Sequence, residues 1–222
     1  MRVSGPVHLR PHADVAERVL LPGDPGRALR LAQQLLDAPK MLNHHRGLWG
    51  YTGAAADGGL LTIQSTGLGG PSAAIVTEEL IALGARRLVR VGTCDSLADL
   101  PLGALVIADA VLAHDGASRA LGAANELAAD PALLAAMVAA GNGAARGRVL
   151  TTDLYYGERA ADALVADLTS GAVFAVAARH GAAAACVLAV SEAQGERLDA
   201  DGIEAVEVEL GRVGAAALHL RH

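Results

Sequence analysis

Three glycine-rich turns carry the residues of this chain that could bind an anion. Each follows a short apolar run: Gly23-Asp24-Pro25-Gly26-Arg27, the stretch STGLGGPS at 65–72, and Arg90-Val91-Gly92-Thr93-Cys94. Where a strand ends and a helix begins, unpaired amide N–H groups and the helix dipole favour an anion. Arg90 lies within an apolar strand pattern, where an unpaired guanidinium is costly to bury. An anionic ligand accounts for both features, although each turn alone is also typical of ordinary chain reversal.

The spacing of these residues argues against several other kinds of site. GLGGPS has serine at the third glycine position of the dinucleotide-binding fingerprint, and GDPGRA lacks the Gly-Lys-Ser/Thr ending of a P-loop. Cys94 and Cys186 are far apart in the sequence, and the adjacent His44 and His45 lack the spacing of a helical metal site. The sequence therefore predicts no metal, no disulfide framework and no organic cofactor.

Composition favours one closely packed core. The chain has 222 residues and is 52% hydrophobic but only 2% aromatic, so Ala, Val and Leu must fill that core. No linker-like stretch divides it, and we expect a single domain over residues 1–222. The net charge of −6 argues against a nucleic-acid-binding surface, and no stretch resembles a signal peptide or membrane span. We expect a cytoplasmic protein with small-molecule partners, without nucleic acid or membrane.

Apolar runs of strand length alternate with helical patterns along the chain. The runs are nearly continuous in hydrophobicity, as in strands buried on both faces. They cover residues 18–23, 60–67, 87–93, 104–113, 147–153 and 183–192. Helical patterns cover residues 71–84, 131–141, about 159–180 and the C-terminal segment 201–220. The alternation predicts an α/β fold, a single-domain three-layer α/β/α arrangement with a mixed, mainly parallel central sheet.

Four blocks of the sequence resemble the nucleoside phosphorylase family, which includes bacterial uridine phosphorylases and hexameric purine nucleoside phosphorylases. The blocks are LLPGDPGRA, HHRGLWGYTG, STGLGGPSAAIVTEELIALGARRLVRVGTC and TTDLYY. The similarity extends from about His8 to the C-terminal helix. It implies phosphate-dependent cleavage of the N-glycosidic bond of a nucleoside, with inorganic phosphate as the co-substrate and a free base and (deoxy)ribose 1-phosphate as products.

Positions that match the family's motifs imply a set of site residues. The phosphate-binding residues would be Gly23, Arg27, Arg46, Arg90 and Thr93. The nucleoside-binding residues would be His8, Cys94, Asp95, Tyr155, Leu168 and Thr169. In the family, the residues matching His8 and Arg46 cross to a neighbouring subunit, which implies a homo-oligomer built from dimers, with a hexamer as the expected form. The alternatives are an ordinary exposed histidine for His8 and a core aromatic for Tyr155.

Several positions depart from the family's pattern. Leu168 and Thr169 replace a Met-Glu pair whose glutamate accepts hydrogen bonds from the ribose hydroxyls. Asp167 or a water could take over that contact, but we favour Asp167 as a residue that starts a helix. Glu192 follows Val-Ser where purine enzymes have a catalytic acid, and its alternative is a solvated strand-end carboxylate. Asp95 replaces a glycine near the expected base, where it could contact the base or cap a turn.

These departures leave three functions open. We favour an active phosphorylase with altered sugar or base preference over a non-catalytic relative that keeps a phosphate pocket. A nucleosidase that uses water has no need of the phosphate arginines.

The sequence gives mixed signals on the base. STGLGGPS and HDGAS (114–118) resemble the uridine branch, and Gly157-Glu158-Arg159 resembles part of its uracil-binding loop without the expected glutamine. Glu192 resembles the purine branch, and the prediction slightly favours a purine.

Overall fold

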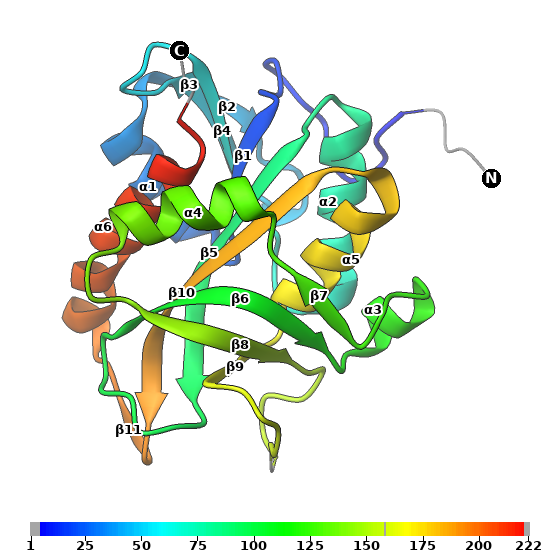
Figure 1. The fold of residues 1–222 in the computed structure, drawn as a ribbon. Coiled ribbons are helices and arrows are strands. Elements are labelled where there is room, and N and C mark those ends of the chain that lie inside the picture. The colour runs from blue at the N-terminus through cyan, green and yellow to red at the C-terminus, as the bar shows by residue number, and fades with distance from the viewer. Residues whose placement is uncertain (1–4, 158, 220–222) are drawn as a thin grey trace.

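Helices cover both faces of a mixed β-sheet in the computed structural model, which describes residues 5–157 and 159–219 (Figure 1). One face carries α1 (Pro25–Leu35), α4 (Pro131–Ala140) and α6 (Ala200–Ala217), on the left of Figure 1. The other face carries α2 (Gly70–Ala82), α3 (Gly116–Ala120) and α5 (Ser170–His180). The predicted three-layer α/β/α arrangement is confirmed. The prediction of one domain also spans residues outside the described ranges and stays a prediction.

Eleven strands of the described residues form the sheet. They are β1 (Arg18–Pro22), β2 (Asp37–Asn43), β3 (Gly50–Ala54), β4 (Leu60–Gln64), β5 (Arg87–Ser96), β6 (Leu105–Ala113), β7 (Glu126–Ala128), β8 (Ala145–Thr151), β9 (Val165–Asp167), β10 (Ala183–Ala193) and β11 (Glu196–Arg197). The ladders β1–β5, β5–β10 and β6–β8 are long and parallel, whereas β2, β3 and β4 pair antiparallel. The sheet is therefore mixed, as predicted.

Five of the strands close into a ring. β5 pairs with both β10 and β9, and the pairings β10–β6, β6–β8 and β8–β9 complete the circuit. The remaining long strands, β1, β4, β3 and β2, extend from β5 as an open sheet. β5 is thus the strand at which the open sheet meets the ring, and residues at its C-terminal end can contact both parts.

The helix predicted for residues 159–180 is wrong in its first half. Val165–Asp167 instead forms β9, which pairs with β8 and β5, and α5 begins at Ser170. The physical reason is that Val165 and Ala166 are buried between two strands, while the Asp167 carboxylate accepts hydrogen bonds from the N–H and Oγ of Ser170. The strands β2, β3, β7, β9 and β11 were not predicted.

Aspartates and prolines fix where helices start. Asp24 accepts a hydrogen bond of 2.7 Å from the Arg27 N–H, and Pro25 is the first residue of α1. Asp130 and Asp199 cap α4 and α6 in the same way. The cap at Asp24 holds the turn between β1 and α1 in place.

Among the helices of the described residues, none has the length and apolar character needed to cross a membrane.

Candidate functional site

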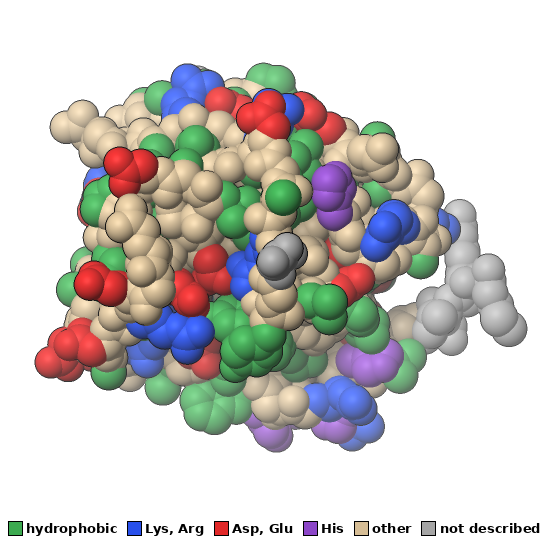
Figure 2. All heavy atoms as spheres, turned by 90° about the horizontal axis from the view of Figure 1, so that it is seen from below, with side chains coloured by type: hydrophobic (Ala, Val, Ile, Leu, Met, Phe, Trp, Pro, Cys, Tyr) green, Lys and Arg blue, Asp and Glu red, His purple; other side chains and the backbone are tan. Residues whose placement is uncertain are grey.

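A cavity of about 370 Å³ lies beyond the C-terminal ends of the parallel strands β1 and β5. Figure 2 looks onto this lower side of the molecule and shows acidic and basic side chains intermingled there, with apolar side chains beside them. Nine of the twelve predicted site residues line the cavity: Gly23, Arg27, Arg90, Thr93, Cys94, Asp95, Tyr155, Leu168 and Thr169. The segments singled out in the sequence therefore converge, although residues 90–94, predicted as a turn, lie within β5, and the roles of these residues stay predictions.

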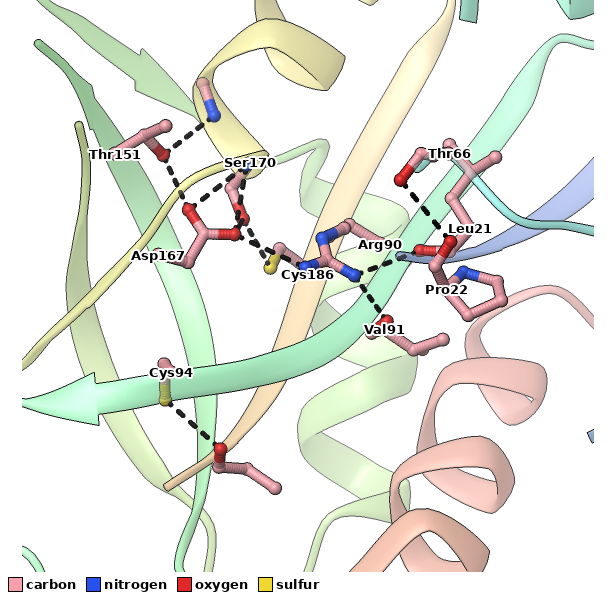
Figure 3. Close-up of polar contacts among 12 residues, drawn as sticks. Leu21, Pro22, Thr66, Arg90, Val91, Cys94, Thr151, Asp167, Ser170 and Cys186 are labelled. Atoms are coloured by element: carbon pink, nitrogen blue, oxygen red, sulfur yellow. Dashed lines mark hydrogen bonds and ion pairs between the residues drawn. The ribbon is translucent and has the colours of Figure 1, made fainter. Parts of the chain in front are cut away.

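Arg90 is held inside the cavity wall by main-chain carbonyls. It is 5% exposed, and its Nη1 donates to Val91 O at 2.6 Å and to Leu21 O at 3.3 Å (Figure 3). Its Nη2 lies 3.6 Å from the Asp167 carboxylate, and its Nε is buried with no hydrogen-bond partner among the described residues. A side chain on Gly92 would overlap the guanidinium. The glycine therefore makes room for Arg90, which lies across it on the same face of β5.

Arg27 approaches the same end of the cavity from the first turn of α1. Its side chain is buried, its backbone N–H is capped by Asp24, and its Nε donates to Glu207 Oε1 at 2.7 Å. Burial lowers the pKa of Arg27, and the Glu207 carboxylate opposes that shift. No hydrogen bond within the described residues engages its two Nη atoms. Two buried guanidinium groups thus face one end of the cavity beside Gly23.

Asp167 is a further cavity residue whose full role the sequence did not predict. Its carboxylate accepts hydrogen bonds of 2.8 Å from the hydroxyls of both Thr151 and Ser170, as Figure 3 shows. The bonds from Ser170 agree with its interpretation as a residue that starts a helix. It also faces Arg90, and the sequence offered no signal for this contact because the two residues lie on different strands. Asp167 therefore links the start of α5 to the arginine.

The other end of the cavity is a network of paired charges. Asp95 forms an ion pair with Arg159, and the Tyr155 hydroxyl donates to Glu192 at 2.8 Å. Arg197 lies 2.9 Å from the same Glu192 carboxylate. Burial and the hydrogen bond to Glu192 raise the pKa of Tyr155 to about 12, so the phenol stays a neutral donor. Each charged group here has a partner of opposite charge.

Glu192 lies beside the main cavity rather than in its lining. It lines an adjoining cavity of about 220 Å³ that shares Asp95 and Arg159 with the first. The structure thus places the predicted acid one side chain away from the predicted nucleoside site. Arg159 lines both cavities, and in the sequence it stood out only as part of the loop stretch 157–159. Glu158 of that stretch lies outside the described residues.

Cys94, Leu168 and Thr169 give the cavity its less polar wall. The Cys94 thiol is buried and donates to Ala189 O at 3.4 Å. Burial raises the pKa of Cys94 well above its ordinary value, so the sulfur remains a neutral thiol. Leu168 and Thr169 follow β9 and lead into α5, and Thr169 is 3% exposed. The wall therefore offers a hydroxyl where the family's pattern has a carboxylate.

His8 and Arg46 do not line the cavity. The His8 ring lies 2.8 Å from Glu79, which also accepts the backbone N–H groups of Val7, His8 and Leu9. These bonds and the His8 side chain overcome the effect of burial and lower the pKa of Glu79. Arg46 is exposed on a turn with a positive φ of 59°. Their predicted reach into a neighbouring subunit stays a prediction.

Comparisons with known proteins show what this chain is similar to. The sequence model of the Phosphorylase superfamily matches residues 17–219. A DeoD-type purine nucleoside phosphorylase from Oceanobacillus iheyensis is 33% identical over 196 residues, which are 81% of this chain and 83% of that protein. A uridine phosphorylase from Treponema pallidum is 40% identical over 108 residues, which are 48% of this chain and 41% of that protein. The crystal structure of a uridine phosphorylase from Vibrio fischeri superposes with a TM-score of 0.80 at 26% identity, covering 92% of this chain and 90% of that one.

Proposed function

The chain belongs to the Phosphorylase superfamily, and from this premise we propose that it catalyses phosphorolysis of a nucleoside. The observation that carries the proposal is the pair of buried guanidinium groups, Arg27 and Arg90, which face one end of the cavity beside the Gly23 turn. A guanidinium fork matches the oxygens of a phosphate, and the two Nη atoms of Arg27 and the Nε of Arg90 have no hydrogen-bond partner among the described residues. Gly23 and Thr93 would add neutral donors to the same phosphate.

The reaction needs a nucleophile below the sugar and a leaving group above it. A phosphate oxygen would attack C1′ of the nucleoside as the C1′–N bond breaks through a sugar with oxocarbenium character. The bonding electrons leave with the base, and the products are a free base and (deoxy)ribose 1-phosphate. Positioning of the phosphate and electrostatic stabilisation of the charge on the sugar supply most of the acceleration. Arg90 and Arg27 therefore act on the nucleophile rather than on the base.

The base would lie toward Asp95, Tyr155 and Arg159. We favour a purine, because a departing purine gains a proton from an acid and Glu192 stands where the purine enzymes that this chain resembles have their acid. For this role Glu192 must release Tyr155 or Arg197 and turn toward the main cavity. We further propose a cytoplasmic homo-oligomer built from dimers, as a hexamer, with His8 and Arg46 completing a neighbour's site.

One experiment separates this function from its alternatives. Purified protein is incubated with inosine, guanosine, adenosine, uridine, thymidine and their deoxy forms, with and without inorganic phosphate, and the released base is quantified by chromatography. Release that requires phosphate supports a phosphorylase and identifies its base. Release without phosphate indicates a nucleosidase. The absence of release from every nucleoside would favour a non-catalytic relative, in agreement with Thr169 in place of the sugar-binding glutamate.

A further inference from the structure

The phosphate end of the cavity is the end that Gly23, Arg27 and Arg90 line. A buried carboxylate on the C-terminal helix lies behind it. Glu207 of α6 is 2% exposed and does not line the cavity. Its two oxygens accept hydrogen bonds from the Nε atoms of two arginines of α1, Arg27 at 2.7 Å and Arg30 at 2.6 Å. A carboxylate with one oxygen committed to each guanidinium is fixed in position, and so are the groups that donate to it.

The contact through Nε decides how Arg27 can face a ligand. Because Glu207 engages the Nε side of Arg27, the two Nη atoms are left without hydrogen bonds from the described residues, and Arg27 lines the cavity. Arg30 differs, since its side chain is 37% exposed and it does not line the cavity. Glu207 therefore holds one arginine toward the ligand and is itself braced by the other.

Charge balance supports the same role. Burial raises the pKa of Glu207, but the hydrogen bonds and charges of Arg30 and Arg27 outweigh it and keep that pKa below its ordinary value. Burial lowers the pKa of Arg27, and the nearby charge of Arg90 lowers it further. A negative charge at Glu207 thus allows two like-charged guanidinium groups to remain close together before any anion is bound.

We propose that Glu207 is a positioning residue of the phosphate site, through which α6 orients Arg27 toward inorganic phosphate. The proposal rests on the proposed phosphorolysis and adds to it a residue far away in the sequence. It gives the C-terminal helix a part in binding the co-substrate, beyond packing on the sheet. Glu207 does not contact the reacting atoms.

The test compares Glu207→Gln with a matched variant on the same helix. Glu207→Gln removes the charge at nearly constant shape, and we expect KM for phosphate to rise about tenfold, with kcat and KM for the nucleoside changed less than about threefold. Glu209→Gln makes the same chemical change at a half-exposed carboxylate that pairs with Arg212, and it should leave both KM values unchanged. Glu207→Asp, which keeps the charge, should raise KM for phosphate less than Glu207→Gln does.

A direct binding readout separates failure of this role from failure of the proposed function. Inorganic phosphate should raise the melting temperature of the wild type and of Glu209→Gln, and raise it less in Glu207→Gln and Glu207→Asp. Equal shifts in all four proteins, or an unchanged KM for phosphate in Glu207→Gln, would overturn the role of Glu207. Base release from the wild type without phosphate would instead overturn phosphorolysis, and the melting shifts would still decide whether Glu207 supports phosphate binding. Should Glu207→Gln not fold, Glu207→Asp provides the same comparison.

Discussion

The two ends of the cavity hold their charged groups in different ways. At the phosphate end, Arg27 and Arg90 are 6% and 5% exposed, and each is fixed by the groups around it. Arg27 is held by α6, and Arg90 by two main-chain carbonyls and the carboxylate at the end of β9. The nucleoside end is the opposite end of the cavity, lined by Asp95, Tyr155 and Arg159. There Tyr155 is 36% exposed, and Glu192 pairs with it and with Arg197 near the surface.

This difference shows which end is organised before substrate arrives. The phosphate end presents guanidinium N–H groups without hydrogen-bond partners among the described residues, on side chains that are already held in place, which is the condition for strong electrostatic stabilisation. At the nucleoside end the charged side chains pair with one another nearer the surface, and Glu192 must release Tyr155 or Arg197 before it can contact a base. We therefore expect substitutions at the phosphate end to have the larger effects, and substitutions at the nucleoside end to change which substrate is used.

Removing the Arg90 side chain should have the largest effect. With Arg90→Ala, we expect kcat/KM for phosphate-dependent base release to fall about 10³-fold, because the anion loses a preorganised charged donor. The fold should survive, since β5 remains paired on both sides. The comparison variant is Arg146→Ala, which removes an exposed arginine of β8 that pairs with Asp109 of β6, and this variant should retain full activity. Unchanged kinetics in Arg90→Ala would remove the phosphate site from this end of the cavity.

Gly92→Ala tests position rather than charge. A methyl group at Gly92 would overlap the Arg90 guanidinium, which is the movable end of a long side chain, so Arg90 must swing aside while β5 stays intact. Because a displacement of about 1 Å can cost about 10²-fold in rate, we expect kcat/KM to fall by about that factor. The double variant Arg90→Ala/Gly92→Ala should be no slower than Arg90→Ala alone. Additive losses would show that Gly92 acts independently of Arg90.

The same contrast explains what the sequence could predict. Gly23 and Arg27 follow β1, and Arg90 lies on its parallel neighbour β5, so their convergence followed from spacing and resemblance. The apolar runs at 87–93 and 183–192 gave the central strands for the same reason. Continuous hydrophobicity marks strands buried on both faces.

Other features depend on partners that the sequence does not place together. Glu207 lies in an amphipathic helix and resembles a solvated residue until α1 packs against it. Val165–Asp167 is too short to show a strand pattern, and only its position between β8 and β5 makes it one. The edge strand β2 contains Pro39 and exposed polar residues, so it has no apolar signal. The closure of five strands into a ring is likewise a property of the assembled sheet.

Glu192→Gln should affect purine nucleosides and spare pyrimidine nucleosides. If Glu192 protonates a departing purine, its amide variant should lose about 10²-fold in kcat for inosine, the lower end of what a general acid supplies. Uridine needs no such proton, so its turnover should change little. Glu196→Gln on β11 removes a nearby exposed carboxylate and serves as the control. An equal loss on both substrates would indicate that Glu192 holds Tyr155 in place instead of acting as an acid.

Thr169→Glu should produce the smallest of these effects, and that effect is a lower KM for a ribonucleoside. Thr169 lines the cavity at the position where the family's pattern has a ribose-binding glutamate. A carboxylate there would accept charge-assisted hydrogen bonds from the 2′- and 3′-hydroxyls, which is worth about 1.5 kcal/mol, or roughly a tenfold lower KM for a ribonucleoside. A 2′,3′-dideoxynucleoside lacks both hydroxyls and should show no gain, and Thr169→Gln should gain less because its amide is uncharged. If KM for the ribonucleoside does not fall, the sugar site has diverged at more positions than Thr169, and the nucleoside end then differs from the phosphate end in its chemistry as well as in its preorganisation.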